Sequence, residues 1–274
     1  MPDEASSGSR RPRRSLGQNF LKDQRVAARI VRACGLTSER TVLEVGPGRG
    51  ALTRLMVGRC ARLILVEKDA GLALDLMHRY REKPGVEVIE GDAATLDLAE
   101  ALGPDDQGVA VGNLPYNAAT PILFNLLEAR ARFKRAVFMF QKEVARRLAA
   151  NPGDREYGAL SLLVQARSQV EMLFEVPPEG FVPKPKVWSA VIRLTPLEKD
   201  IAPQDPGFDR MVHALHSGPR KTARNSLSQG LGISASKAAA LLEAAGADPG
   251  TRPCCITPLQ AADLWMEFSK DLAD

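Results

Sequence analysis

The stretch Thr41-Val42-Leu43-Glu44-Val45-Gly46-Pro47-Gly48-Arg49-Gly50 decides the fold of this chain. Its first five residues are short, β-branched and mostly apolar, which is typical of a buried parallel strand. The glycines that follow let the backbone turn sharply and approach a ligand without a Cβ in the way. A helix beginning near Ala51 would direct its first free N–H groups into the same crevice. The stretch therefore predicts a strand, a ligand-binding turn and a helix, the opening unit of a Rossmann-like, doubly wound α/β domain.

Two acidic residues stand at the ends of the next two predicted strands. The strand 62–66 ends at Glu67, and the strand 86–89 leads to Asp92. Because the carboxyl ends of parallel strands meet at one edge of a sheet, both carboxylates face the glycine turn. We expect Glu67 to accept hydrogen bonds from ribose hydroxyls and Asp92 to meet an adenine amino group. The alternative is that both are ordinary solvated acids at strand ends.

The nature of the nucleotide remains open from the turn alone. Gly46 and Gly48, with Glu67 downstream, also satisfy the loose fingerprint of a dinucleotide site. Pro47 and Glu44 are unusual in a pyrophosphate loop, where a carboxylate would repel the phosphates. The sulfonium and amino groups of S-adenosylmethionine would instead be attracted by a negative charge. These residues favour S-adenosylmethionine over NAD as the cofactor.

The tetrapeptide Asn113-Leu114-Pro115-Tyr116 follows the predicted strand 109–111 on the same edge of the sheet. The carbonyls of Asn113 and Leu114 can accept hydrogen bonds from a planar amino group and free its lone pair for methyl transfer. Pro115 restricts Leu114 to an extended conformation, and Tyr116 offers a ring for stacking. Catalysis would rest on positioning and electrostatics. A plain turn is the alternative, and the tetrapeptide does not distinguish adenine from a protein glutamine.

With these residues in view, the chain resembles the bacterial small-subunit ribosomal RNA adenine dimethyltransferases, from about Ser15 to its end. Besides the segments above, the resemblance is carried by Leu16-Gly17-Gln18-Asn19-Phe20-Leu21, by residues 141–148, by residues 157–161, by residues 181–191 and by residues 220–227. It implies that Asn19 and Leu21 contact the methyl donor and that Phe181 covers the target base. The chain departs from the usual pattern at Ala118, Ala119, His216, Pro219 and Ala223.

The net charge of +4 is unevenly distributed. Residues 1–32, 130–181 and 182–274 carry net charges of +5, +3 and +1, whereas residues 33–129 carry −5. An acidic cofactor half with basic flanks suits a sulfonium donor and a polyanionic substrate. Solvated helix faces are the plain alternative for the basic clusters. The cations that we expect to bind RNA phosphates are Arg146, Arg147, Arg220, Lys221 and Arg224.

The length of 274 residues allows one large α/β domain and a small appendage. We assign residues 1–14 to a disordered basic arm, 15–197 to the α/β domain and 198–274 to an all-helical domain that contacts RNA. Helical spacing recurs at 208–216, 222–231, 235–245 and 258–272. The four cysteines lack metal-ligand or disulfide spacing, so no metal is expected. No apolar run reaches the length needed to span a membrane, and no segment has the pattern of a signal peptide. We expect a cytoplasmic monomer.

The resemblance implies transfer of methyl groups to N6 of two adjacent adenosines in the 3′-terminal hairpin loop of small-subunit RNA, within a 30S assembly intermediate. A loop target makes physical sense because its bases can be splayed out and held between aromatic rings. Two alternatives remain. One is a large-subunit adenine methyltransferase of the macrolide-resistance type. The other is an RNA-binding assembly or transcription factor without catalysis, which the intact Asn113–Tyr116 tetrapeptide disfavours.

Overall fold

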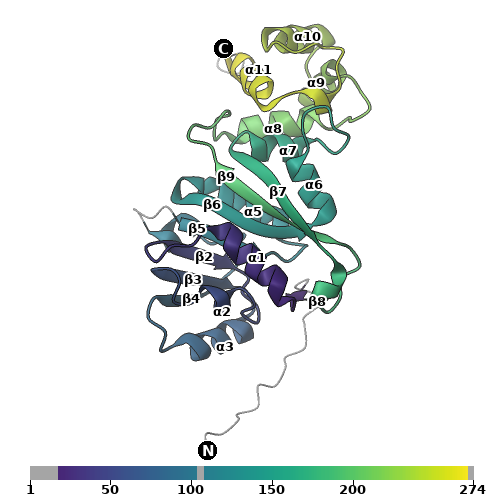
Figure 1. Cartoon of the computed structure of the whole chain (residues 1–274). Coiled ribbons are helices and arrows are strands. Elements are labelled where there is room, and N and C mark those ends of the chain that lie inside the picture. Colours follow the sequence, from purple (N-terminus) through teal and green to yellow (C-terminus); the bar gives the residue numbers. More distant parts are fainter. Residues whose placement is uncertain (1–17, 104–107, 271–274) are drawn as a thin grey trace, which may run out of the picture.

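A seven-stranded mixed sheet forms the centre of the molecule in the computed structural model, which describes residues 18–103 and 108–270 (Figure 1). The strand order is β4-β3-β2-β5-β6-β9-β7. The strands are β2 (Thr41–Val45), β3 (Arg62–Glu67), β4 (Val86–Glu90), β5 (Gly108–Asn113), β6 (Phe133–Gln141), β7 (Ser168–Val176) and β9 (Ser189–Pro196). Neighbouring strands from β4 to β6 are parallel, whereas β9 runs antiparallel to both β6 and β7. The predicted Rossmann-like α/β fold is confirmed.

Helices cover both faces of the sheet, and the alternation of side chains along the strands explains why. In β2, Leu43 and Val45 belong to one apolar cluster, while Val42 belongs to the other. The first cluster includes side chains from α4 (Leu98–Leu102), α5 (Ala119–Glu128), α6 (Lys142–Ala149) and α7 (Ala159–Gln165). The second includes side chains from α1 (Gln24–Cys34), α2 (Thr53–Met56) and α3 (Ala70–Tyr80). Strands that are apolar on both faces are therefore buried between two helical layers.

The helix expected to begin near Ala51 starts later and is shorter than a full helix of the fold. Helix α2 begins at Thr53 and has only four residues. Gly48 and Gly50 have φ angles of +55° and +79°, which lie in the left-handed region, so the chain forms turns up to this point. The binding turn is therefore built from backbone turns rather than from the N-terminus of a long helix.

A second, two-stranded sheet joins the two ends of the α/β region. Strand β1 (Phe20–Leu21) pairs antiparallel with β8 (Phe181–Val182). Next to it, the Asp23 carboxylate accepts hydrogen bonds from the backbone N–H groups of Arg25 and Val26 and so caps α1. The pairing holds the first described residues of the chain against a segment near residue 181. The sequence analysis did not predict either strand.

The C-terminal part of the chain is helical, as predicted, and lies at the end of the sheet beside α7 (Figure 1). Its helices are α8 (Pro206–Leu215), α9 (Ala223–Leu231), α10 (Ala235–Ala244) and α11 (Pro258–Lys270). Their apolar cluster also contains Leu162 and Leu163 of α7. The C-terminal helices therefore share a core with a helix of the α/β region, and the boundary between 197 and 198 stays a prediction.

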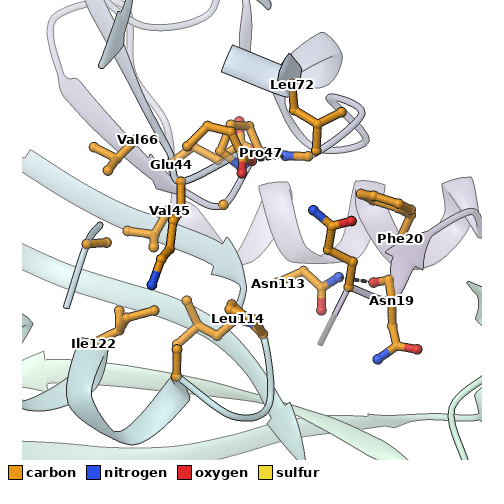
Figure 2. A pocket seen from close by; sticks show the side chains of 18 of the residues that line it. Asn19, Phe20, Glu44, Val45, Pro47, Val66, Leu72, Asn113, Leu114 and Ile122 are labelled. Atoms are coloured by element: carbon orange, nitrogen blue, oxygen red, sulfur yellow. Dashed lines mark hydrogen bonds between the residues drawn. The ribbon is translucent and has the colours of Figure 1, made fainter. Parts of the chain in front are cut away.

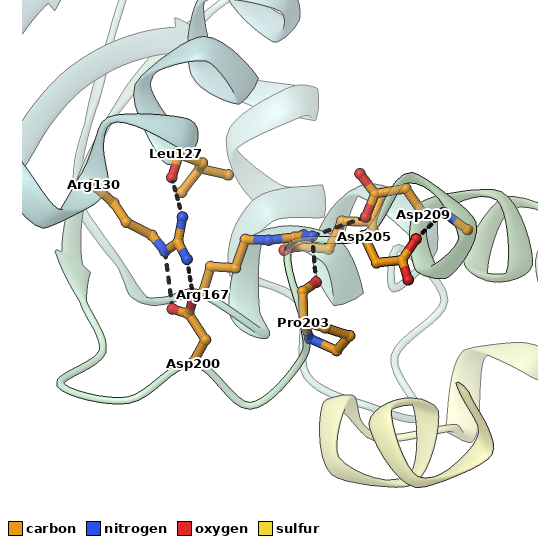
Figure 3. A network of polar contacts seen from close by, with 9 residues as sticks. Leu127, Arg130, Arg167, Asp200, Pro203, Asp205 and Asp209 are labelled. Atoms are coloured by element: carbon orange, nitrogen blue, oxygen red, sulfur yellow. Dashed lines mark hydrogen bonds and ion pairs between the residues drawn. The ribbon is translucent and has the colours of Figure 1, made fainter. Parts of the chain in front are cut away.

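Two arginines fasten the linker between β9 and α8 (Figure 3). The Arg130 guanidinium forms an ion pair with Asp200 and donates a hydrogen bond to the Leu127 carbonyl at 2.8 Å. Arg167, only 5 % exposed, donates to the Asp209 carboxylate of α8 at 2.9 Å. A buried charge that loses its partner is costly. These contacts therefore fix α8 against the α/β region.

Part of the sequence analysis falls outside the described residues. The basic arm 1–14 and the first residues of the opening motif, Leu16 and Gly17, lie there. Among the helices of residues 18–103 and 108–270, none has the length and apolar character needed to cross a membrane.

Candidate active site

One pocket at the carboxyl edge of the parallel strands collects the predicted cofactor and catalytic residues (Figure 2). Its walls come from β1, from the turn after β2, from the ends of β3 and β4, and from the segment after β5. The predicted site residues that line it are Asn19, Leu21, Gly46, Gly48, Glu67, Asp92, Asn113, Leu114, Pro115 and Tyr116. Segments almost a hundred residues apart in sequence therefore meet at one cavity. The individual roles of these residues stay predictions.

The glycine turn forms one wall, and its backbone requires glycine. Gly46 and Gly48 have φ angles of +64° and +55°. A Cβ at Gly48 would also lie only 3.0 Å from the Phe20 ring. The Arg49 guanidinium lies over the same ring, 4.6 Å from its centroid. Phe20 therefore packs directly on the turn, and no larger residue than glycine fits beneath it.

The Glu67 carboxylate is buried and supports the turn. One oxygen accepts a hydrogen bond from the Gly48 N–H at 2.9 Å, and the other accepts one from the Asp69 N–H at 2.9 Å. Burial raises the pKa of Glu67 above its usual value, and these two backbone donors oppose the shift. Each carboxylate oxygen has a further lone pair for a ligand. Glu67 is therefore both a support of the glycine turn and an available acceptor in the pocket.

Glu44 forms a second buried carboxyl in the same wall. It is 1 % exposed and accepts a hydrogen bond from the Thr53 hydroxyl at 2.7 Å. Burial raises its pKa from 4.5 to about 8, partly opposed by that hydrogen bond. At neutral pH the side chain is mostly protonated when no cation is near. A cationic ligand in the pocket would favour the ionised form.

Asp92 lies in a different environment. Its carboxylate forms an ion pair with Lys68 at 2.6 Å and accepts a hydrogen bond from the Ala94 N–H at 3.0 Å. The hydrogen bond from Lys68 lowers the pKa of Asp92, so this carboxylate is ionised at neutral pH. An exposed ion pair of this kind is weak and leaves the side chain able to exchange partners.

Asn113 lies at the junction of the cofactor and catalytic walls. Its side-chain N–H₂ donates a hydrogen bond to the Asn19 carbonyl at 2.8 Å, as Figure 2 shows. This contact fixes the orientation of the amide, because it assigns the nitrogen to Asn19 and leaves the oxygen on the other arm. The first segment of the pocket and the predicted catalytic segment are therefore joined directly.

Tyr116 lines the pocket and is held by a partner that the sequence did not indicate. Its hydroxyl shares a hydrogen bond of 2.7 Å with the Ser189 hydroxyl at the start of β9. Burial raises the pKa of Tyr116, so the phenol stays neutral. The two residues are 73 positions apart, and no local pattern links them.

Phe181 is the predicted catalytic residue that the structure places elsewhere. Its side chain is 1 % exposed and packs in the apolar cluster with Leu21 and Val176. It is absent from the residues that line the described pocket. A role against the target base stays a prediction for Phe181, and it requires the ring to leave this position.

The predicted RNA-binding residues lie outside the pocket on exposed surfaces. Arg146 and Arg147 belong to α6, and Arg146 lies 3.7 Å from the Glu175 carboxylate. Arg220 and Lys221 precede α9, to which Arg224 belongs. Lys221 contacts Gln229, and the Arg224 guanidinium donates to the side chain of Asn225 at 3.3 Å. The structure therefore separates these cations into one group on α6 and another at α9.

Comparisons with known proteins agree with this geometry. The sequence profile of the family described as ribosomal RNA adenine dimethylase matches residues 9–244. A protein of Geobacter metallireducens named ribosomal RNA small subunit methyltransferase A is 43 % identical over 247 residues, which cover 88 % of this chain and 90 % of that protein. Residues 9–244 include every predicted site residue. The chain belongs to this family.

Solved structures show the same relationship. A dimethyladenosine transferase from Plasmodium falciparum superposes with a TM-score of 0.78 at 26 % identity, covering 92 % of this chain and 98 % of that one. The 23S rRNA methyltransferase ErmE superposes with a TM-score of 0.70 at 27 % identity, covering 92 % of this chain and 100 % of that one. Matches over nearly the whole length include the C-terminal helices as well as the sheet. Sequence, fold and pocket agree in making this protein a ribosomal RNA adenine dimethylase family member, and so a methyltransferase.

Proposed function

We propose that this enzyme transfers methyl groups from S-adenosylmethionine to N6 of two adjacent adenosines in the 3′-terminal hairpin loop of small-subunit ribosomal RNA. The product is N6,N6-dimethyladenosine at both positions. The observation that carries the proposal is that an intact Asn113–Tyr116 segment shares one pocket with the glycine turn and Glu67. The 43 % identity to a small-subunit methyltransferase, against 27 % to the large-subunit enzyme, favours the small subunit as the target.

The pocket residues fit S-adenosylmethionine in charge and shape. Glu44 and Glu67 place two buried carboxyls in the wall, which suits a ligand that carries a sulfonium and an amino group. The left-handed glycines line the cavity with backbone, and a Cβ at Gly48 would meet the Phe20 ring that also lines it. Glu67 would accept from the ribose hydroxyls and Asp92 from the adenine amino group, with Asn19 and Leu21 closing the other side. When bound, the cofactor supplies an electrophilic methyl group.

The catalytic wall would orient the target nitrogen. An adenine amino group is a poor nucleophile because its lone pair is conjugated into the ring. Acceptors at the Asn113 side-chain oxygen and the Leu114 carbonyl would draw its N–H bonds toward them and expose the lone pair. The nitrogen gains the methyl group, and the proton leaves afterwards to solvent. No strong base is needed, so the wall acts by positioning and electrostatics.

The second methylation sets a limit on this geometry. A monomethylated adenine has one N–H donor left, so the pocket must accept an amine that donates only once. Tyr116, held by Ser189, is a ring in the pocket wall on which either base could stack. Phe181 would supply the opposite ring only after moving out of the apolar cluster.

The basic groups on α6 and α9 would hold the RNA outside the pocket. Arg146, Arg147, Arg220, Lys221 and Arg224 are exposed cations of the kind that neutralise phosphates. We place the substrate within a 30S assembly intermediate in the cytoplasm and the enzyme as a monomer. The α/β domain of residues 15–197 would carry the chemistry, and the helical domain of residues 198–274 would contribute RNA contacts.

The test is methyl transfer to small subunits from cells that lack this gene. Purified protein and labelled donor should add about four methyl groups per subunit, and primer extension should stop at the two adenosines. Large subunits treated in the same way should stay unlabelled. Labelling of the large subunit instead would support the macrolide-resistance alternative. Binding without any transfer would support the non-catalytic alternative.

A further inference from the structure

An exposed aromatic residue lies next in sequence to the residue that holds Tyr116 of the pocket wall. Trp188 is 46 % exposed, whereas the neighbouring Ser189 is fully buried and hydrogen-bonded to Tyr116. Consecutive Cα atoms are about 3.8 Å apart. The Trp188 backbone therefore adjoins the residue that holds Tyr116 in the pocket wall, and we call the surface at Trp188 the rim of the site. Exposed apolar groups that gather on a surface mark binding sites, and the segment of Trp188 also carries exposed valines.

The segment that carries Trp188 is held at both ends, by the pocket-lining strand β1 at one end and by α6 at the other. At its start, Phe181 pairs with Leu21, which lines the pocket. At its end, the Trp188 carbonyl accepts a hydrogen bond of 2.9 Å from the Lys142 N–H, at the first residue of α6. The backbone of Trp188 is therefore held by the sheet and by a helix. A ring on a fixed backbone loses little freedom when a ligand stacks on it.

The surroundings of the ring are both apolar and cationic. Val182 and Val187 are also exposed, at 43 % and 44 %. Lys184 and Lys186 lie between them on the surface, and the Lys142 ammonium stands over the Trp188 ring at 5.4 Å from its centroid. Lys142 and Arg146 share the Glu175 carboxylate, and Lys184 forms an ion pair with Glu179. With Lys186, these cations outnumber the two carboxylates, so the group keeps a net positive charge. Aromatic and basic side chains in alternation are the arrangement that binds single-stranded nucleic acid.

We propose that Trp188 is a stacking platform for an unpaired RNA base next to the target adenosine. This inference rests on the proposed function, because it takes the RNA loop as the partner. The base stacks on the exposed ring while the phosphates beside it meet Lys184, Lys186 and the cations of α6. Trp188 thereby holds the loop in the register that directs one adenosine into the pocket.

Substitutions at position 188 test the platform against the same undermethylated small subunits. Trp188→Ala should weaken binding about tenfold, since losing one stacked base has an effect of this order. Trp188→Phe should keep most of the affinity because it retains a ring. Trp188→Leu, apolar but without a ring, should behave like Trp188→Ala. The slope of log affinity against log salt should stay unchanged in all three, because stacking releases no counterions.

A spectroscopic measurement reports on the ring itself. The chain has two tryptophans, and the other, Trp265, is buried among the C-terminal helices. Protein labelled with hydroxytryptophan can be excited apart from the ribosomal proteins. Subunit binding should quench the labelled wild type and leave labelled Trp188→Phe, which reports only Trp265, unquenched. Equal quenching in the two proteins would show that position 188 meets no base.

The outcomes separate this inference from the proposed function. If the wild type methylates the subunits but Trp188→Ala binds them equally well, the platform is wrong and the function stands. If Trp188→Leu retains wild-type affinity, the rim makes an apolar contact without stacking, and the platform is again wrong. If the wild type neither binds nor methylates the subunits, the proposed function fails and the platform fails with it. Unchanged affinity for S-adenosylmethionine in Trp188→Ala shows that the pocket is intact.

Discussion

The Glu44 and Glu67 carboxyls of the pocket are buried and hydrogen-bonded within this chain, whereas the cations of α6 and α9 stand at the surface. Glu67 accepts from two backbone N–H groups, and Glu44 accepts from Thr53. Arg147, by contrast, is exposed. Polar groups in the pocket therefore hold the shape of the site as well as any ligand. The surface cations are available to a partner and owe little to the fold.

This difference predicts that mutations in the pocket and mutations on the basic helices have effects of different size and different salt dependence. A change in the pocket should remove both a ligand contact and part of the supporting structure, with large effects that salt does not alter. A change on the basic helices should have a small effect that depends strongly on ionic strength.

The largest effect is expected at Asn113. Asn113→Ala should slow single-turnover methyl transfer on undermethylated small subunits about a hundredfold or more, because the lost acceptor acts on the transition state. Affinity for the donor, measured by calorimetry, should change less. Asn113→Asp serves as the matched control, since it keeps acceptor oxygens but cannot donate to Asn19. Near-normal turnover in Asn113→Ala would reduce this residue to part of a turn.

A smaller loss is expected for Glu67→Ala. Hydrogen bonds to a charged group contribute about 1.5–3 kcal/mol each, so donor affinity should fall about tenfold to more than a hundredfold. Glu67→Gln keeps one acceptor oxygen and should lie between Glu67→Ala and the wild type. Thermal denaturation of the ligand-free proteins separates loss of the turn from loss of the ligand contact. Unchanged donor affinity, or binding of NAD, would contradict the assignment.

The cations of the basic helices should each have a modest effect. Arg147→Ala and Lys221→Ala should weaken subunit binding and flatten the plot of log affinity against log salt by just under one unit each. Arg81→Ala removes an equally exposed charge near α3, where the side chain is 71 % exposed, and should leave the slope alone. If all three variants match the wild type, the basic groups are solvated faces and the division between the regions fails.

The smallest effect concerns pH and the ligand-free pocket. The pKa of Glu44 is raised from 4.5 to about 8 by burial, so the folded state binds this proton more tightly than the unfolded state does. The contribution of Glu44 to stability is therefore full below pH 4.5 and is lost as pH rises toward 8. Glu44→Gln cannot ionise and keeps an acceptor for Thr53. The Tm of Glu44→Gln minus that of the wild type should grow across this window and level off above it; a constant difference would contradict the burial effect.

Much of the sheet could be predicted because its strands are encoded locally. Strand β2 matches its predicted bounds, and the segments near residues 62, 86 and 109 are strands within a few residues of prediction. Helix α2 begins two residues after its predicted start near Ala51 and has only four residues, a brevity for which we found no signal in the sequence. The two-residue strands β1 and β8 depend on a pairing across most of the chain, for which local patterns carry no information.

The candidate site shows the same limit. The motif residues could be placed at one edge because parallel strands share a carboxyl end. The contacts that hold them could not, since Tyr116 meets Ser189 and Asn113 meets Asn19 only in three dimensions. The burial of Phe181 was also beyond sequence patterns, because a Phe beside exposed residues can face either way.

The arginine contacts at the linker keep the distance between the pocket and the C-terminal helices constant. Arg167, buried and bound to Asp209, keeps α8 from swinging relative to the sheet, and α9 packs beside α8. The span from the pocket to the cations of α9 is thereby set by the protein and does not adjust to the RNA. An RNA can then bind the pocket and the cations of α9 together only when the distance between its loop and its contacted phosphates equals this span. The rigidity of the protein would therefore select RNAs by their shape before any base is recognised.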